Sequence, residues 1–468
     1  MKKIINLILC TLLIGFISGQ NITGQWNGVL KVPGQTLRLV FHVQETDSGF
    51  TATMDSPDQN AFSISVTDIS FRDNTLTIKI KKLNVHYTGI LNNDTINGLF
   101  KQGGAPVPLN LYKGEVKIEK PLRPQEPIKP YPYYEEEVRF DNPTAQGVTL
   151  AGTLTLPHQE GVFPAVILIS GSGQQNRDEE VFGHKPFLVI ADFLTRNGFA
   201  VLRYDDRGAA ASTGVADTCN TYDFSTDAEA AFQYLQKRKE INPKQIGFAG
   251  HSEGGMIAPL VAARNKEVAS VILLAAPGIR GDSLLLLQAK LIAQSTPGVS
   301  KKEIEKGLNN RRRQDSIVFH TADVGQMENS LIVFFKELFD SQVHSSSTQE
   351  EKETLVKQSV KMCTSKFYQY LVKYEPAPAL AQVKCPVLAI NGEKDLQVSA
   401  EENLNAIQKI LLNAGNKEVT IKKFPNLNHL FQSSKTGSVS EYVQIEETFS
   451  QDVLEVILGW LKEKYKIE

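Results

Sequence analysis

Residues 245–256 read QIGFAGHSEGGM and place a serine in the pattern Gly-x-Ser-x-Gly, from Gly250 to Gly254. A short apolar stretch precedes the pattern, and an apolar segment long enough for a helix follows it. A glycine-rich turn between a buried strand and a helix lets the chain reverse sharply, so that the serine hydroxyl projects from the turn. This stretch predicts a strand–turn–helix in which Ser252 is the candidate nucleophile.

A serine hydroxyl is a weak nucleophile unless a base removes its proton. In folds with this turn, the reactive groups follow the order serine, acid, histidine along the chain. Three histidines follow Ser252, and two of them fall within the helical region described below, which leaves His429 as the candidate base. Residues 391–395 (NGEKD) follow a predicted strand and supply two acids, Asp395, which we prefer, and Glu393. A carboxylate at this place would fix the tautomer of His429 and stabilise its protonated form.

Attack on a carbonyl also requires donors for the negative charge that develops on its oxygen. One expected donor is the backbone N–H of Glu253, directly after the nucleophile. The second is expected from the glycine-containing loop at residues 170–174, where the candidates are Ser172, Gly173 and Gln174. This loop lacks the complete G-x-G-x-x-G pattern of a dinucleotide site, and no cluster of cysteines and histidines indicates a metal site. We therefore expect neither a cofactor nor a metal.

From about residue 135 to the end of the chain, apolar strands alternate with helical segments. The alternation predicts an α/β fold with a mainly parallel sheet and helices on both faces. Residues 147–156 predict an antiparallel edge strand of this sheet. Between residues 282 and 380 the alternation stops and the pattern is helical, which predicts a cap over the carboxyl edge of the sheet. The other expected strands are 165–170, 199–204, 245–249, 270–275, 386–391 and 419–424, and the expected helices include 185–197, 227–238, 256–264, 401–412 and 449–464.

Residues 20–114 show period-2 alternation of apolar and polar residues, broken by turn signals and by no helical stretch. This pattern predicts a small all-β domain, either an antiparallel meander or a small barrel. Residues 115–134 contain five prolines and predict an extended linker between that domain and the α/β domain at 135–468. The β domain contains no visible constellation of reactive groups.

The chain begins with two lysines and an apolar run at residues 4–17, which predicts a signal peptide over residues 1–19 and export to the periplasm or the medium. The run is shorter than the ~20 residues that cross a bilayer, so we expect no stable membrane span once it is removed. The 468 residues carry a formal charge of −2, which gives no electrostatic reason to expect nucleic-acid binding. The sequence favours no particular oligomeric state.

Four stretches carry a likeness to a known family: residues 171–179 (GSGQQNRDE), 183–187 (GHKPF), 202–208 (LRYDDRG) and 250–254 (GHSEG). From about residue 135 onward the chain resembles a bacterial carboxylesterase family of the α/β-hydrolase superfamily, often grouped with serine-aminopeptidase-like hydrolases. The preceding β domain and linker look like the arrangement in exported members. The resemblance implies serine esterase activity on small acyl esters, with Ser252, Asp395 and His429 as the catalytic triad.

The chain departs from the family pattern directly after the stretch 202–208. The family usually reads Gly-Val-Gly-x-Ser where residues 208–212 read GAAAS, so Ala210 stands in place of a glycine. An alanine held at positive φ costs about 1 kcal/mol. We therefore expect this loop to differ in shape from that of the family.

Two other functions remain open at this point. A peptidase of the same fold would need an acidic group to hold the α-amine of its substrate, and no motif singles one out. A non-catalytic protein that binds carbohydrate or lipid through its β domain would not need the complete set of Ser252, Asp395 and His429. A small-molecule ester is therefore the expected partner.

Overall fold

The computed structural model of the chain describes residues 21–32, 35–47, 49–59, 61–102, 106–114, 122–342 and 349–467. The chain divides into two compact units, with the second running from Glu119 to Glu468 and the first comprising most of the chain before it. The expected signal peptide at 1–19 and the first part of the expected linker, 115–121, lie outside the described residues.

The first unit is a sheet of nine antiparallel strands in the order β4-β3-β2-β1-β9-β8-β7-β6-β5. The outermost strands, β4 and β5, are joined by only Val66 and Thr67, so the sheet must curl until its two ends meet. In this link Val66 N–H donates to the Ala52 carbonyl of β3 and Thr67 N–H donates to the Lys79 carbonyl of β6, so the chain passes directly from one end of the sheet to the other. The strands are β1 (Gly24–Val32), β2 (Gln35–Thr46), β3 (Gly49–Ser56), β4 (Ala61–Ser65), β5 (Asp68–Arg72), β6 (Thr75–Ile80), β7 (Val85–Asn92), β8 (Thr95–Gln102) and β9 (Val107–Lys113).

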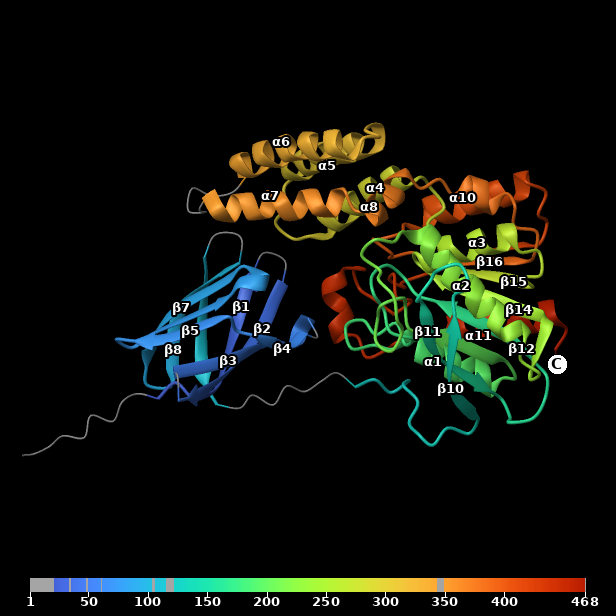
Figure 1. Cartoon of the computed structure of the whole chain (residues 1–468), viewed down its shortest axis with the longest axis horizontal. Helices are drawn as coiled ribbons and strands as arrows, with labels where there is room; N and C mark the ends of the chain where they lie inside the picture. The colour runs from blue at the N-terminus through green and yellow to red at the C-terminus, as the bar shows by residue number, and fades with distance from the viewer. Residues whose placement is uncertain are drawn as a thin grey trace, which may run out of the picture. The chain divides into compact units, whose positions relative to one another are not determined.

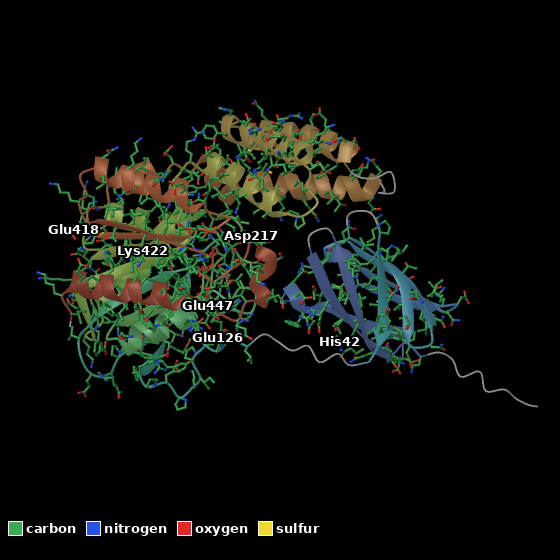
Figure 2. The ribbon with its side chains drawn as sticks, turned by 180° about the vertical axis from the view of Figure 1, so that it is seen from behind. His42, Glu126, Asp217, Glu418, Lys422 and Glu447 are labelled. Carbon is green, nitrogen blue, oxygen red and sulfur yellow. The ribbon has the colours of Figure 1, made fainter. Side chains whose placement is uncertain are left out.

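The inside of this curled sheet is filled by large apolar side chains, among them Trp26, Phe41 and Tyr87. His42 points away from that core on β2, where its Nε2 atom lies 2.8 Å from Oδ2 of Asp55 (Figure 2). The all-β fold expected for this part of the chain is thus confirmed.

The second unit is built on an eight-stranded sheet in the order β10-β11-β13-β12-β14-β15-β16-β17. The pairs from β13 to β17 are parallel, whereas β10 and β11 run antiparallel to their neighbours. The central strands β12 and β15 are mostly apolar and are buried along nearly their whole length, because both faces of the sheet are covered. The strands are β10 (Tyr134–Asp141), β11 (Thr149–Leu156), β12 (Phe163–Ile169), β13 (Ala200–Tyr204), β14 (Ile241–His251), β15 (Ser270–Leu274), β16 (Val387–Gly392) and β17 (Val419–Phe424).

Helices cover both faces of this sheet, as the sequence predicts (Figure 1). One face packs against α2 (Thr221–Gln236), α3 (Gly254–Arg264) and α10 (Ala400–Asn413). The other face packs against α1 (Pro186–Arg196) and α11 (Gln451–Tyr465). The mainly parallel sheet between two helical layers confirms the predicted α/β fold.

Between β15 and β16 the chain forms the expected run of helices, which has a small apolar core of its own around Phe334 and Val360 (Figure 1). Its helices are α4 (Gly281–Ser295), α5 (Lys301–His320), α6 (Val324–Gln342), α7 (Gln349–Cys363), α8 (Lys366–Lys373) and α9 (Ala377–Leu380). Within the described ranges, no helix is both long and apolar enough to cross a membrane.

One expected element is wrong: β11 is not an edge strand, because β10 lies outside it and pairs with it along its whole length. The first half of β10 contains a run of three glutamates, so its sequence shows little apolar alternation. Its Val138 and Phe140 face the core, while Arg139 between them and Glu137 and Asp141 on either side are exposed. An edge strand with one solvated face tolerates this composition.

Candidate active site

Ser252 lies in the short turn between β14 and α3, with a φ of +51°. Its N–H donates to the Leu274 carbonyl at 2.8 Å, which ties the turn to the neighbouring strand. The glycines on either side are required by space, since a Cβ on Gly250 would meet the Gly254 backbone and one on Gly254 would meet the carbonyl of Ile169. The spacing of the Gly-x-Ser-x-Gly pattern is therefore a packing requirement of this turn.

His429 and Asp395 are buried and hydrogen-bonded to each other, with Nδ1 of the ring 2.7 Å from Oδ2 of the carboxylate. The other oxygen of Asp395 accepts the N–H groups of Gln397 at 2.8 Å and Val398 at 2.9 Å, which fixes the carboxylate. A carboxylate can only accept, so Nδ1 carries the hydrogen, and Nε2 of the neutral ring is free to accept a proton. Glu393, the alternative acid, is exposed.

Ser252 and His429 line one cavity of about 380 Å³ above the carboxyl edge of the sheet. In the described part of the chain no hydrogen bond joins the Ser252 hydroxyl to the His429 ring, and such pairs often tighten only when substrate binds. The cap supplies part of the cavity wall through Leu284 and Leu285 of α4 and Phe367 of α8. The cap helices therefore limit the room beside Ser252.

The loop after β12 presents three backbone N–H groups near this cavity and the cavity next to it. Gly171 N–H donates to Oε1 of Glu179 at 2.6 Å, and Gln175 N–H donates to Oδ2 of Asp206 at 2.9 Å, so both ends of the loop are held. Between these two ends lie Ser172, Gly173 and Gln174. Their backbone N–H groups, and that of Glu253, donate to no other described residue. Of these, Ser172 lines the cavity that contains Ser252, whereas Gly173 and Gln174 line a neighbouring cavity.

The side chain of Glu253 is a feature that the sequence analysis missed. It is buried behind the turn, where Oε1 accepts a hydrogen bond from the Thr221 hydroxyl at 2.8 Å. Burial raises the pKa of Glu253 to about 7, although hydrogen bonds from the hydroxyls of Thr221 and Ser172 oppose the rise. Glu253 belongs to one of the two stretches that offer N–H groups to the cavity and Ser172 to the other, and the effect of the Ser172 hydroxyl on the pKa of Glu253 shows that the two stretches are close here.

His251 bridges two parts of the site. Its place directly before the nucleophile fits an orienting or packing role. Its Nε2 lies 3.0 Å from the His429 carbonyl and its Nδ1 lies 2.9 Å from Oε1 of Glu179. Both partners only accept, so both ring nitrogens donate and the ring is protonated. Burial alone would lower the pKa of His251, but the Glu179 carboxylate and these hydrogen bonds raise it above its ordinary value.

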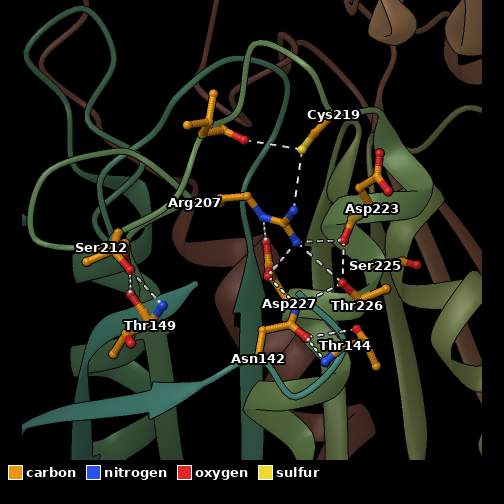
Figure 3. A network of polar contacts seen from close by, with 12 residues as sticks. Asn142, Thr144, Thr149, Arg207, Ser212, Cys219, Asp223, Ser225, Thr226 and Asp227 are labelled. Atoms are coloured by element: carbon orange, nitrogen blue, oxygen red, sulfur yellow. Dashed lines mark hydrogen bonds and ion pairs between the residues drawn. The ribbon is translucent and has the colours of Figure 1, made fainter. Parts of the chain in front are cut away.

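The loop after β13 is held by a buried arginine, whose contacts Figure 3 shows. The Arg207 guanidinium donates to both oxygens of Asp227, at 3.0 and 2.9 Å, and to the sulfur of Cys219 at 3.3 Å. Three residues further on, Ala210 adopts a φ of +42°, the left-handed conformation for which the family pattern provides a glycine. The loop thus keeps a left-handed residue at this position without a glycine.

A second cavity of about 710 Å³ adjoins the first and shares Gly171, Glu253 and Phe367 with it. Its lining includes Asp217, which is exposed and is labelled in Figure 2, and Asp206, which is half-buried. Burial raises the pKa of Asp206 to about 8, while hydrogen bonds from the Ser170 hydroxyl and Gln175 N–H act in the opposite direction. Among the described residues, no group of three or more His, Cys, Asp and Glu side chains is arranged to hold a metal ion.

Comparison with known proteins agrees with this architecture. Residues 164–436 match the model of the alpha/beta hydrolase fold family. Esterase EstD of Thermotoga maritima is 25% identical over 335 residues, which cover 70% of this chain and 69% of that protein. Among solved structures, the alpha/beta hydrolase GrgF from a Penicillium species is 16% identical over 71% of this chain and 100% of its own, with a TM-score of 0.46. The Pyrococcus furiosus esterase Pf2001 is 16% identical over 71% of this chain and 93% of its own, with a TM-score of 0.41. The chain belongs to the alpha/beta hydrolase fold family, and its similarity to an esterase indicates a hydrolase.

Proposed function

We propose that the protein is a serine carboxylesterase that hydrolyses small acyl esters. The observation that carries the proposal is the hydrogen bond between His429 Nδ1 and Asp395 Oδ2, because it leaves Nε2 free in a cavity that Ser252 also lines. The similarity to Esterase EstD supports the choice of an ester as substrate. The cavity of about 380 Å³ beside Ser252 is bounded by the cap and has room for the acyl group of a small ester.

In the proposed reaction, Ser252 Oγ attacks the ester carbonyl carbon while His429 Nε2 takes the hydroxyl proton. Asp395 stabilises the resulting imidazolium. The negative charge on the carbonyl oxygen is stabilised by the N–H of Glu253 and by one N–H from the loop 172–174. His429 then gives its proton to the departing alcohol, which leaves an acyl group on Ser252.

Water releases the acyl group in the second half of the reaction. His429 takes a proton from the water as the water oxygen attacks the acyl carbon. The charge on the carbonyl oxygen is stabilised as in the first half. Ser252 regains its proton as the carboxylic acid departs, so the enzyme returns to its starting state.

The experiment that tests this function compares p-nitrophenyl acetate, butyrate and longer esters with aminoacyl anilides on the full-length protein. We expect turnover of the short esters, with kcat/KM falling as the acyl chain lengthens. Faster turnover of anilides than of esters would favour a peptidase of the same fold. Turnover of neither class would contradict both activities and favour a binding protein.

We further propose that the protein is exported, on the basis of the two lysines and the apolar run at residues 4–17. Expression of the full-length gene followed by cell fractionation and intact-mass measurement tests this. The proposal expects a periplasmic or secreted product that starts near Gln20, and an uncleaved product retained in the cytoplasm would contradict it.

A further inference from the structure

We propose that Arg123 is a positioning residue that holds one wall of the active-site cavity. The inference rests on the proposed function, since it concerns the cavity that contains Ser252 and His429. Arg123 belongs to the proline-rich stretch at residues 115–134, for which the sequence indicates only a spacer. Within the second unit, Arg123 is one of the residues that attach this stretch to the rest of the fold.

The Arg123 guanidinium joins two segments that lie far apart in the sequence. On one side, Nε donates to the Gly183 carbonyl at 3.1 Å and Nη2 to that of Phe182 at 3.4 Å. On the other side, Nη2 donates to the Val443 carbonyl at 3.0 Å and Nη1 to that of Ile445 at 2.8 Å. One planar cation thus cross-links four backbone carbonyls.

These two segments form one wall of the cavity. Phe182 and Tyr442 both line it, and their rings pack edge to face with centroids 5.5 Å apart. Phe182 has a φ of +53° and Gly183 one of +74°, so two consecutive residues are left-handed. A phenylalanine in this conformation persists only where its surroundings hold it. Arg123 binds the carbonyls of these same two residues, and we infer that it provides part of that hold.

The chemistry of the contact requires an arginine. Burial lowers the pKa of Arg123, and the carboxylates of Glu126 and Glu446 oppose this shift. Glu126, labelled in Figure 2, is itself partly buried. Hydrogen bonds from an ionised donor are stronger than neutral ones, and the fixed fork of the guanidinium reaches several acceptors at once. A lysine carries the same charge on a single nitrogen and cannot bridge the four carbonyls in the same way.

Gln125, two residues further along, makes a second attachment next to the first. Its Oε1 accepts the N–H groups of Thr448 at 2.6 Å and Phe449 at 3.1 Å, and its Nε2 donates to the Phe449 carbonyl at 2.6 Å. The Phe449 ring packs against Phe431, two residues after His429, with centroids 5.3 Å apart. The stretch therefore also contacts the packing beneath the candidate base.

The direct test is hydrogen exchange of full-length variants, read by mass spectrometry at residues 180–186 and 439–449. Arg123→Ala should speed exchange in both segments by about tenfold or more, because their shared anchor is lost. Lys129→Ala is the matched control, since Lys129 is an exposed cation of the same stretch that pairs with Glu135. Unchanged exchange in Arg123→Ala would overturn the proposal, and this readout does not depend on any activity.

Kinetics on p-nitrophenyl butyrate test the consequence for the cavity. We expect kcat/KM of Arg123→Ala to fall roughly 10- to 100-fold, chiefly through KM, with partial recovery in Arg123→Lys and wild-type values in Lys129→Ala. Equal kinetics in the folded Arg123→Ala and Lys129→Ala variants would overturn the positioning role. If Arg123→Ala does not fold, Arg123→Lys and Gln125→Ala carry the same test, and wild-type exchange and kinetics in both would overturn it. If the wild-type protein shows no esterase activity, the proposed function is contradicted. The role of Arg123 is then tested by hydrogen exchange alone.

Discussion

Nδ1 of His429 lies 2.7 Å from Oδ2 of Asp395, and the second oxygen of this carboxylate is held by two backbone N–H groups. Asp395→Asn would turn a fixed acceptor into a group that can donate, so His429 would adopt the wrong tautomer. We expect kcat on p-nitrophenyl butyrate to fall about 10⁴-fold. The matched control is Glu393→Gln, the exposed acid two residues earlier, which should retain wild-type kcat. Wild-type kcat in Asp395→Asn together with a large loss of kcat in Glu393→Gln would identify Glu393 as the acid of the triad.

We expect ionisation of the Glu253 carboxyl to lower kcat at alkaline pH. Burial raises its pKa to about 7, so the group is neutral below that pH and gains a negative charge as the pH rises through it. A carboxylate next to the N–H groups that stabilise the oxyanion opposes the charge on that oxygen, by roughly five-fold in rate. We expect kcat of the wild type to decline above about pH 7 and that of Glu253→Gln to stay level. Identical alkaline limbs in the two proteins would refute this role.

We expect the buried His184 to make the free energy of unfolding depend on pH. Nε2 donates to the Tyr442 carbonyl, Nδ1 lies 3.1 Å from the Thr448 hydroxyl, and burial lowers the pKa of His184 from 6.5 to about 4. The unfolded chain therefore binds a proton as the pH falls below about 6.5, whereas the folded chain does not until about pH 4. His184 by itself should lower the free energy of unfolding by about 2–3 kcal/mol across this window, whereas the raised pKa values of Glu253 and Asp206 change it in the opposite direction.

Urea denaturation at several pH values measures this dependence. Between pH 6.5 and 4, the free energy of unfolding of His184→Gln should rise relative to that of the wild type by about 2–3 kcal/mol, because the variant lacks this one proton uptake. His158→Gln, which removes an exposed histidine, should leave the pH dependence as in the wild type. An equal pH dependence in all three proteins would show that the proton uptake lies elsewhere.

We expect replacement of Ala210 by glycine to stabilise the protein. Its φ of +42° is strained for a residue with a Cβ, and glycine adopts it freely at some cost in the unfolded state. We expect Ala210→Gly to raise the free energy of unfolding by about 0.5–1 kcal/mol in thermal or urea denaturation. Ala209→Gly, at the neighbouring residue without a positive φ, should lower it. A loss of stability in both variants would mean that the strain at Ala210 is small.

The α/β unit could be predicted well because its signals are local. The central strands are unbroken apolar runs, and the turn at Ser252 needs its glycines for contacts that involve only its own backbone and the end of β12. The helix expected from residue 227 begins six residues earlier, at Thr221, and the sequence does contain the signal for this start. Asn220 and Asp223 form a capping box there, which marks the true beginning of the helix.

The contacts that join distant segments could not be read from the sequence. Nothing in the local pattern links Arg123 to Val443, or His251 to Glu179, because these pairs are created by the tertiary fold. The pairing of Glu253 with Ser172 is of the same kind, and a glutamate after the nucleophile has no special local signature. The sequence could therefore indicate the candidate triad through motif and order along the chain, while the groups that hold it in place required the structure.

The measurement that tests the central claim most directly is the pre-steady-state release of p-nitrophenol from p-nitrophenyl acetate by the wild type and Ser252→Ala, with intact-mass detection of the acylated protein. Ser252 is the only side chain to which the proposed reaction attaches the acyl group. We predict an acetyl group on Ser252 in the wild type and, in Ser252→Ala, no such adduct and turnover lower by about 10⁶-fold. Wild-type turnover in Ser252→Ala, or an acetyl group that forms and turns over on another residue, would contradict the account.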